Sequence, residues 1–181
     1  MPLPKDNTYT IDDIYSLPDN ERAELIDGQL YAMTPPGRIH QKLIMQISAT
    51  VHNYIQSNNG SCEVYPAPFA VFLNSDSKTY VEPDISVICD SNKLNDNGCN
   101  GAPDWIIEIV SPSSKRMDYF IKLFKYRTAG VKEYWIIDPE KKQVTVYDFI
   151  HNDENSDIYS FDDTIKVNLY NNLSIRINDF I

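Results

Sequence analysis

The chain has 181 residues, of which 42% are hydrophobic and 12% aromatic, and its formal net charge is −10. A chain of this length can bury one good core, so we expect a single domain over residues 1–181. No apolar run reaches the ~20 residues of a membrane helix, and residues 1–6 lack the apolar core of a signal peptide. These features predict a cytoplasmic protein with no membrane partner. The negative charge counts against nucleic acid as a partner, because binding to a phosphate backbone is largely electrostatic.

The three cysteines, Cys62, Cys89 and Cys99, are odd in number, and their spacings match no zinc or redox pattern. They predict free thiols in a reducing compartment.

The first third of the chain predicts a short helix, a hairpin and a long helix. Residues 10–15 favour the short helix, and Asp27-Gly28 is typical of a two-residue turn within a hairpin at residues 24–34. The long helix follows from one apolar stripe with a period of 3.6 residues, and Asn58-Asn59-Gly60 ends it. The stripe consists of Ile39, Leu43, Ile44, Ile47, Val51, Tyr54 and Ile55.

The rest of the chain predicts mainly strands. A second helix begins at Ser113 or Ser114 and ends at Ala129-Gly130, and the polar loop 90–101 is expected to be mobile. The predicted strands cover residues 62–65, 69–73, 84–89, 104–110, 133–138 and 143–149, with further short strands from residue 158. Together these elements predict a mixed sheet with two main helices.

One carboxylate interrupts the strand that we predict to be the most buried. Glu108 shares a face with Ile106 and Val110 by strand alternation, and an ionised side chain there needs a partner charge, a metal or a proton. Asp84 begins another β-branched strand, so two strands with one acid each indicate a cation site. The alternatives are a turn-capping role for Asp84 and a metal-free buried salt bridge from Glu108 to Lys122.

A basic segment follows the Glu108 strand. Residues 115–132 contain six lysines and arginines and one acid. Lys115 and Arg116 stand at the expected helix N-terminus, which favours phosphate, and Lys125 follows on the same helix. The segment is either a phosphate-facing surface or an ordinary solvated helix face.

Several short motifs occur in a fixed order along the chain. They are Arg22-Ala23-Glu24-Leu25-Ile26-Asp27-Gly28, His40, Pro83-Asp84, residues 101–114, Asp118 with Lys122, and residues 130–135. In this order they resemble the Uma-two family, a bacterial family of restriction-endonuclease-like proteins in the PD-(D/E)XK nuclease superfamily. The resemblance covers about residues 10–149, and residues 150–181 add C-terminal strands. It implies an α/β single-domain restriction-endonuclease-like fold, with a mixed central sheet flanked by helices.

The resemblance also implies a site. Asp84 and Glu108 would hold Mg²⁺ or Mn²⁺, with the backbone carbonyl of Ile109 as a further ligand, because these cations prefer hard oxygen ligands. Such an ion polarises a phosphodiester and lowers the pKa of a bound water.

The chain departs from the superfamily pattern at the catalytic lysine. That lysine normally follows the second acid by two positions, where this chain has Val110. By motif its place is taken by Lys122, which would offset charge on the phosphorus. The alternative is an ordinary i,i+4 helix pair between Asp118 and Lys122.

Three further residues have open roles. Glu24 matches an early acidic position of the family and is either a third carboxylate near the metal or an exposed acid at a hairpin edge. His40 is either an accessory site residue or a structural histidine. Tyr126 either contacts substrate or packs in the core.

These residues predict a metal-dependent endonuclease that hydrolyses DNA. Its expected partners are DNA and a divalent metal, and the sequence leaves open whether two copies of the chain form a homodimer. The alternative is a non-catalytic nucleic-acid-binding or protein-interaction module that keeps the nuclease fold, which the acidic net charge favours. A phosphodiesterase acting on RNA or a small molecule would use the same residues.

Overall fold

A six-stranded mixed sheet forms the centre of the molecule. The computed structural model describes residues 8–112, 114–152 and 155–181. The strand order is β11-β10-β9-β8-β5-β3, and only β8 and β9 run parallel. The bounds are β3 Glu63–Pro66, β5 Ile85–Ile88, β8 Trp105–Ile109, β9 Glu133–Asp138, β10 Gln143–Asp148 and β11 Asp157–Ser160. The predicted mixed α/β sheet is thus confirmed.

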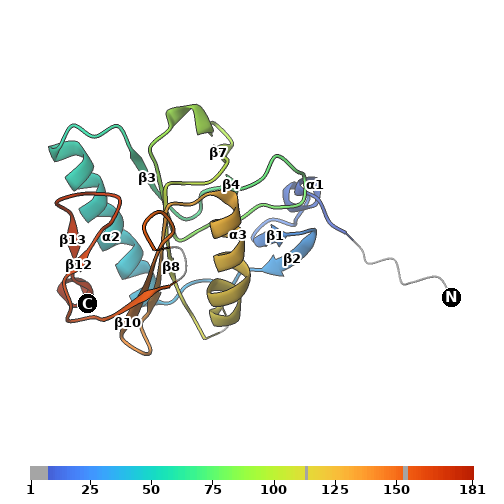
Figure 1. Cartoon of the computed structure of the whole chain (residues 1–181). Helices are drawn as coiled ribbons and strands as arrows, with labels where there is room; N and C mark the ends of the chain where they lie inside the picture. The colour runs from blue at the N-terminus through green and yellow to red at the C-terminus, as the bar shows by residue number, and fades with distance from the viewer. Residues whose placement is uncertain (1–7, 113, 153–154) are drawn as a thin grey trace.

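Helices lie on both sides of this sheet (Figure 1). Helix α2, Arg38–Ser57, covers one face, and its predicted apolar stripe is buried or packed against the core. On the other face, a π-helix η2, Met117–Lys122, continues directly into α3, Leu123–Ala129. Gly130 closes α3 with a left-handed φ of 95°. The second predicted helix is therefore present, but its first half is wound more widely than the pattern predicted.

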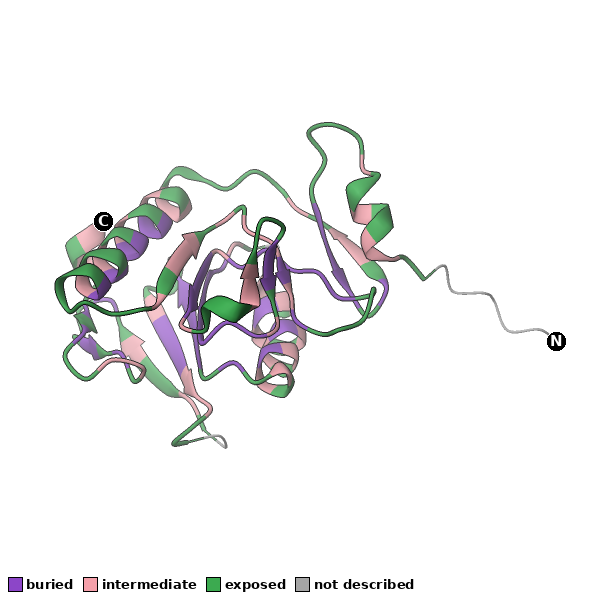
Figure 2. Cartoon of the chain, turned by 90° about the horizontal axis from the view of Figure 1, so that it is seen from above, coloured by how far each residue is buried: buried purple, intermediate pink, exposed green. Residues whose placement is uncertain are grey.

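Strand alternation divides the core into two layers. Trp105, Ile107 and Ile109 of β8 pack toward α2, whereas Ile106 and the following Val110 pack on the opposite side, with Tyr126 of α3. The central strands are buried from end to end (Figure 2). Glu108 therefore projects on the α3 side, as alternation predicted.

Smaller elements surround the central sheet. The hairpin of β1, Ala23–Ile26, and β2, Gln29–Ala32, turns at Asp27 and Gly28, which both have positive φ. At the N-terminal end of the described chain lies α1, Ile11–Tyr15. At the C-terminal end, β12, Ile165–Lys166, β13, Ser174–Ile175, and η3, Ile177–Phe180, close the α2-side core.

The loop that we expected to be mobile is structured. After η1, Ser91–Lys93, it forms β6, Leu94–Asn95, and β7, Gly98–Asn100, which make a three-stranded sheet with β4, Val71–Phe72. Cys99 is fully buried there, so this polar segment is held by packing that its composition did not reveal.

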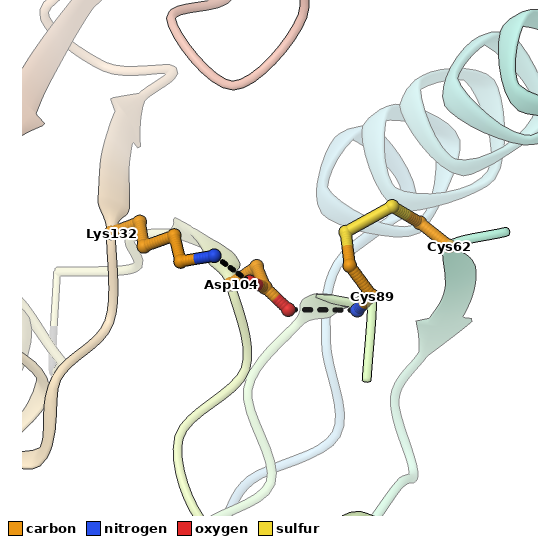
Figure 3. Close-up of a disulfide and its surroundings, with 4 residues drawn as sticks. All are labelled: Cys62, Cys89, Asp104 and Lys132. Carbon is orange, nitrogen blue, oxygen red and sulfur yellow. Dashed lines mark hydrogen bonds and ion pairs between the residues drawn. A yellow bond between two sulfur atoms is a disulfide. The ribbon is translucent and has the colours of Figure 1, made fainter. Parts of the chain in front are cut away.

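The prediction of free thiols is wrong for two of the three cysteines. Cys62 and Cys89 form a disulfide, and Cys99 is free and buried. Glu63 of β3 faces Ile88 of β5, so the next pair outward along these antiparallel strands is Cys62 and Cys89. Beside the disulfide, Asp104 accepts a hydrogen bond from the Cys89 backbone and pairs with Lys132 (Figure 3). Spacing along the chain carries no information about this cross-strand neighbourhood.

None of the helices in the described part of the chain is long and apolar enough to cross a membrane. The cytoplasmic location stays a prediction.

Candidate active site

Asp84 and Glu108 meet because of the register of β5 and β8. Ile85 faces Ile107 in this antiparallel pair, so the next pair is Asp84 and Glu108. The Asp84 backbone N–H donates to Glu108 Oε2 at 3.3 Å, and the Ile109 N–H donates to Asp84 Oδ2 at 2.7 Å. Two like charges directly opposite one another are destabilising in an unassisted sheet. The surroundings must therefore supply positive charge.

Lys122 supplies that charge from the helix above the sheet. Its Nζ lies 2.9 Å from Glu108 Oε1, 2.9 Å from Glu24 Oε2 and 3.6 Å from Asp118 Oδ1. The lysine side chain is only 6% exposed. Lys122 is therefore more than the i,i+4 partner of Asp118, because it joins the helix to β1 and β8.

Two tyrosines complete the contacts below the helix. The Tyr126 hydroxyl donates to Glu108 Oε1 at 2.7 Å, and the Tyr134 hydroxyl donates to the Asp118 backbone carbonyl at 3.1 Å. Their rings meet edge to face with centroids 5.0 Å apart, and both are fully buried. Tyr126 thus orients Glu108 rather than presenting a surface to substrate.

Glu24 is not the exposed acid that its hairpin position allowed. Its side chain is 6% exposed, Oε2 pairs with Lys122, and Oε1 accepts a hydrogen bond from the Glu82 backbone at 2.9 Å. Sequence reasoning missed Glu82, which is buried, accepts from Tyr80 and pairs with Arg22. The sequence signal that could have identified Glu82 is its position directly before Pro83-Asp84.

His40 reaches the site from the first turn of α2. Its Nε2 lies 3.1 Å from Asp84 Oδ2. Burial lowers the pKa of His40, but the Asp84 carboxylate and the backbone of Ile109 together raise the pKa by more than burial lowers it. The net pKa of His40 therefore lies above its ordinary value. The structure therefore places this histidine against two of the three predicted metal ligands.

The cluster holds more carboxylates than cations. Burial raises the pKa of Glu108 well above its usual range and also raises the pKa of Asp118, although the Lys122 ammonium opposes both shifts. Burial lowers the pKa of Lys122, but Glu108, Glu24 and Asp118 together raise it well above its ordinary value, so Lys122 is charged. A buried excess of carboxylates favours the uptake of a proton or a cation.

The available oxygens fit a hard divalent cation. Over the described ranges, no group of three or more His, Cys, Asp or Glu side chains is arranged as a metal site. The predicted ligand set needs only two, Asp84 and Glu108, with the Ile109 carbonyl. Glu108 Oε2 accepts one long hydrogen bond, and no described residue donates to Asp84 Oδ1. Two carboxylate oxygens from adjacent strands thus suit Mg²⁺ or Mn²⁺.

The basic segment is largely neutralised by acids from elsewhere in the chain. Lys115 Nζ lies 3.2 Å from Asp138 and 2.6 Å from Glu140, and Lys125 pairs with Asp27. Arg116 is exposed and forms no ion pair with any residue that the structure describes. Among the three predicted phosphate contacts, Arg116 is therefore the one whose charge is not paired with an acid of the described chain.

Comparison with known families gives this geometry a context. Residues 11–177 match the model of the family Uma2, described as "Putative restriction endonuclease". The chain belongs to the Uma2 family. The match runs beyond the residues that carried the resemblance and includes β11 to β13.

Two relatives of this Uma2 protein are proteins of one Synechocystis strain. It is 24% identical over 138 residues to the uncharacterized protein slr1290 of Synechocystis sp. (strain ATCC 27184 / PCC 6803 / Kazusa), covering 76% of this chain and 70% of that one. It is 26% identical over 121 residues to the uncharacterized protein sll1609 of the same organism, covering 65% and 67%.

A solved structure has the same fold. The crystal structure of a putative nuclease belonging to DUF820 from Anabaena variabilis ATCC 29413 superposes with a TM-score of 0.76 at 22% identity. The superposition covers 94% of this chain and 96% of that chain. It confirms the fold that the motifs implied.

Proposed function

We propose that this Uma2 protein is a metal-dependent endonuclease that hydrolyses DNA phosphodiester bonds. One observation carries the proposal. Asp84 and Glu108 face each other on β5 and β8, with the Lys122 ammonium 2.9 Å from Glu108. The family description supports the same class of reaction.

Asp84, Glu108 and the Ile109 carbonyl would hold Mg²⁺ or Mn²⁺. When bound, such an ion polarises a phosphodiester and lowers the pKa of a coordinated water. In the net reaction water adds across a P–O bond. The phosphorus gains a hydroxyl group, and the leaving oxygen gains a proton.

Lys122 contributes a fixed positive charge. An ammonium held in a buried site opposes the charge that develops on the phosphoryl oxygens. Glu24 and Asp118 keep it charged and in place, and Tyr126 orients Glu108. His40 positions Asp84 from the edge of the sheet. Lys122 is thus the proposed catalytic cation, and the other four act through Lys122 or the acids.

Cleavage assays on purified variants test this proposal. Plasmid, single-stranded DNA and RNA are incubated with magnesium, manganese or EDTA. Wild type should cut DNA only with metal, and Asp84→Asn and Glu108→Gln should each cut at least about 100-fold more slowly, because each loses a group that acts in the transition state. Asp96→Asn, a change at an exposed acid, should match wild type.

Three outcomes contradict the proposal. Wild-type cleavage by Glu108→Gln would place hydrolysis elsewhere. Cleavage of RNA alone would change the substrate. DNA binding without cleavage in any metal would favour the non-catalytic module.

A further inference from the structure

An open groove lies beside the N-terminal half of the helix that carries Lys122. Its volume is about 510 Å³, and it is lined by Lys115, Arg116, Tyr119, Phe120, Lys141 and Tyr147. Tyr119 and Phe120 belong to the same π-helix as Asp118 and Lys122, which instead contact the buried acids. The helix therefore forms a common wall between the groove and the candidate active site.

The lining combines cations with aromatic rings. Within the described chain, none of the residues that line the groove is acidic, although the protein carries a net charge of −10. Arg116 and Lys141 are exposed and have no ion pair with a described residue. Lys115 pairs with the buried Asp138 and with Glu140, so the positive charge of the groove comes from Arg116 and Lys141. The groove is thus a local positive site on an acidic protein.

The aromatic residues of the lining differ in exposure. Phe120 is 70% exposed, whereas Tyr119 and Tyr147 are half-buried and pack against the α3-side core. From Tyr147 a row of aromatic groups continues along the chain. Tyr147 stacks on both Tyr134 and Phe149, with centroids 6.0 Å apart in each pair, and the Arg127 guanidinium lies 5.1 Å from the Phe149 centroid. Tyr147 is therefore held by its neighbouring rings, and Phe120 provides the exposed ring face of the groove.

We propose that this groove binds single-stranded DNA, with a base stacked on Phe120 and phosphates at Arg116 and Lys141. Aromatic platforms combined with a cationic track are the usual means of binding unpaired strands. A duplex keeps its bases stacked on one another, and an acidic peptide would match the cations but leave the ring faces unused. The inference rests on the proposed function and specifies an unpaired strand as the form of DNA engaged.

Fluorescence anisotropy with the full chain in EDTA tests the groove without hydrolysis. The probe is a labelled oligothymidylate of about 12 nucleotides, within the range that such platforms cover. Phe120→Ala should weaken binding by about 5- to 150-fold, the scale of losing one stacked base. Phe124→Ala is the matched control, because Phe124 is 62% exposed on the next helical turn and lies outside the groove lining. It should bind as wild type does.

The charged residues give a second readout. Arg116→Ala with Lys141→Ala should flatten the logarithmic salt dependence by about 1.4, the value for two phosphate contacts on a single strand. Lys142→Ala, an exposed neighbour outside the groove lining, should leave the slope unchanged.

Several results would overturn the inference. These are equal binding of an abasic oligonucleotide, equal effects of Phe120→Ala and Phe124→Ala, preference for duplex DNA, or full competition by polyglutamate. Binding in EDTA with the predicted variant pattern would support the groove even if no metal gave cleavage. Metal-dependent cleavage with no effect of the groove variants would support only the proposed hydrolysis.

Discussion

Lys122 is the residue on which the candidate site depends most. Its ammonium contacts acids from β1, β8 and its own helix while remaining almost inaccessible to water. A buried ion network of this kind adds modest net stability, but removing one member leaves uncompensated charge. The same position thus serves both folding and the proposed chemistry.

Lys122→Met should lower the free energy of unfolding by about 3–5 kcal/mol, because it leaves Glu24, Glu108 and Asp118 without their shared cation. Urea unfolding of the metal-free protein measures this change. Lys125→Met is the control, since Lys125 pairs only with the exposed Asp27 in the described chain. It should cost less than about 1 kcal/mol. Equal losses in the two variants would make Lys122 an ordinary surface cation.

The pH dependence of that loss has a definite sign. Burial already raises the pKa of Glu108, and Lys122 opposes the shift. Without Lys122 the pKa rises further, so the folded variant binds more protons than the unfolded chain. Its stability deficit should therefore be large near about pH 7 and shrink toward about pH 5. Urea unfolding at the two pH values tests this, and a deficit that grows on acidification would contradict it.

At the scale of elements, the antiparallel pairing of β3, β5 and β8 determines two features at once. One end of β5 places Asp84 opposite Glu108, and the other end places Cys89 opposite Cys62. The acids and the disulfide are therefore consequences of one register. The π-helix is a second determining element, since wide helical turns of this kind occur often at functional sites and this one carries Asp118 and Lys122.

The disulfide predicts a specific thiol count. The chain has three cysteines, so denatured protein should show one reactive thiol without reductant and three after reduction. The native protein should show none, because Cys99 is buried. Removing the bridge with Cys62→Ser and Cys89→Ser should cost about 2–4 kcal/mol of stability. Titration of the denatured protein with a thiol reagent measures these counts. Three reactive thiols without reductant would show that Cys62 and Cys89 are not bonded.

At the scale of the whole molecule, the sheet separates two cores, and the site belongs to only one of them. The α2-side core contains Trp105 and Trp135, whose rings meet edge to face 5.2 Å apart. The α3-side core surrounds the acidic cluster. Among the residues that the structure describes, His40 is the one of α2 that pairs with an acid of the cluster, at the edge of the sheet. One core can therefore maintain the fold while the other accommodates buried charge.

Magnesium should stabilise the whole chain, because an ion that binds only the folded state shifts the unfolding equilibrium. At about 100 times its Kd, the gain is about 2.7 kcal/mol, or several degrees in Tm for a chain of this size. Asp84→Asn should abolish the magnesium-induced shift, whereas Asp96→Asn should keep it. Calorimetry with magnesium or EDTA measures both, and a full shift in Asp84→Asn would exclude Asp84 as a ligand.

Local periodicity was enough to predict most elements and one key orientation. The stripe that includes Leu43 and Ile47 predicted α2, and alternation placed Glu108 on the face of Ile106. These features follow from the sequence alone, because backbone geometry repeats every few residues and determines which side a residue faces. Ordered motifs around Asp84 and Glu108 were likewise sufficient to predict the family.

Only the tertiary structure decided which side chains become partners. Glu24 reaches Lys122, Cys62 pairs with Cys89, and Asp138 with Glu140 takes up the charge of Lys115. The groove around Phe120 likewise needs residues from β10 and from the turn before it. Such partners depend on strand register and on how a helix docks across the sheet. Those are properties of the assembled chain, because they bring together residues that no local repeat relates.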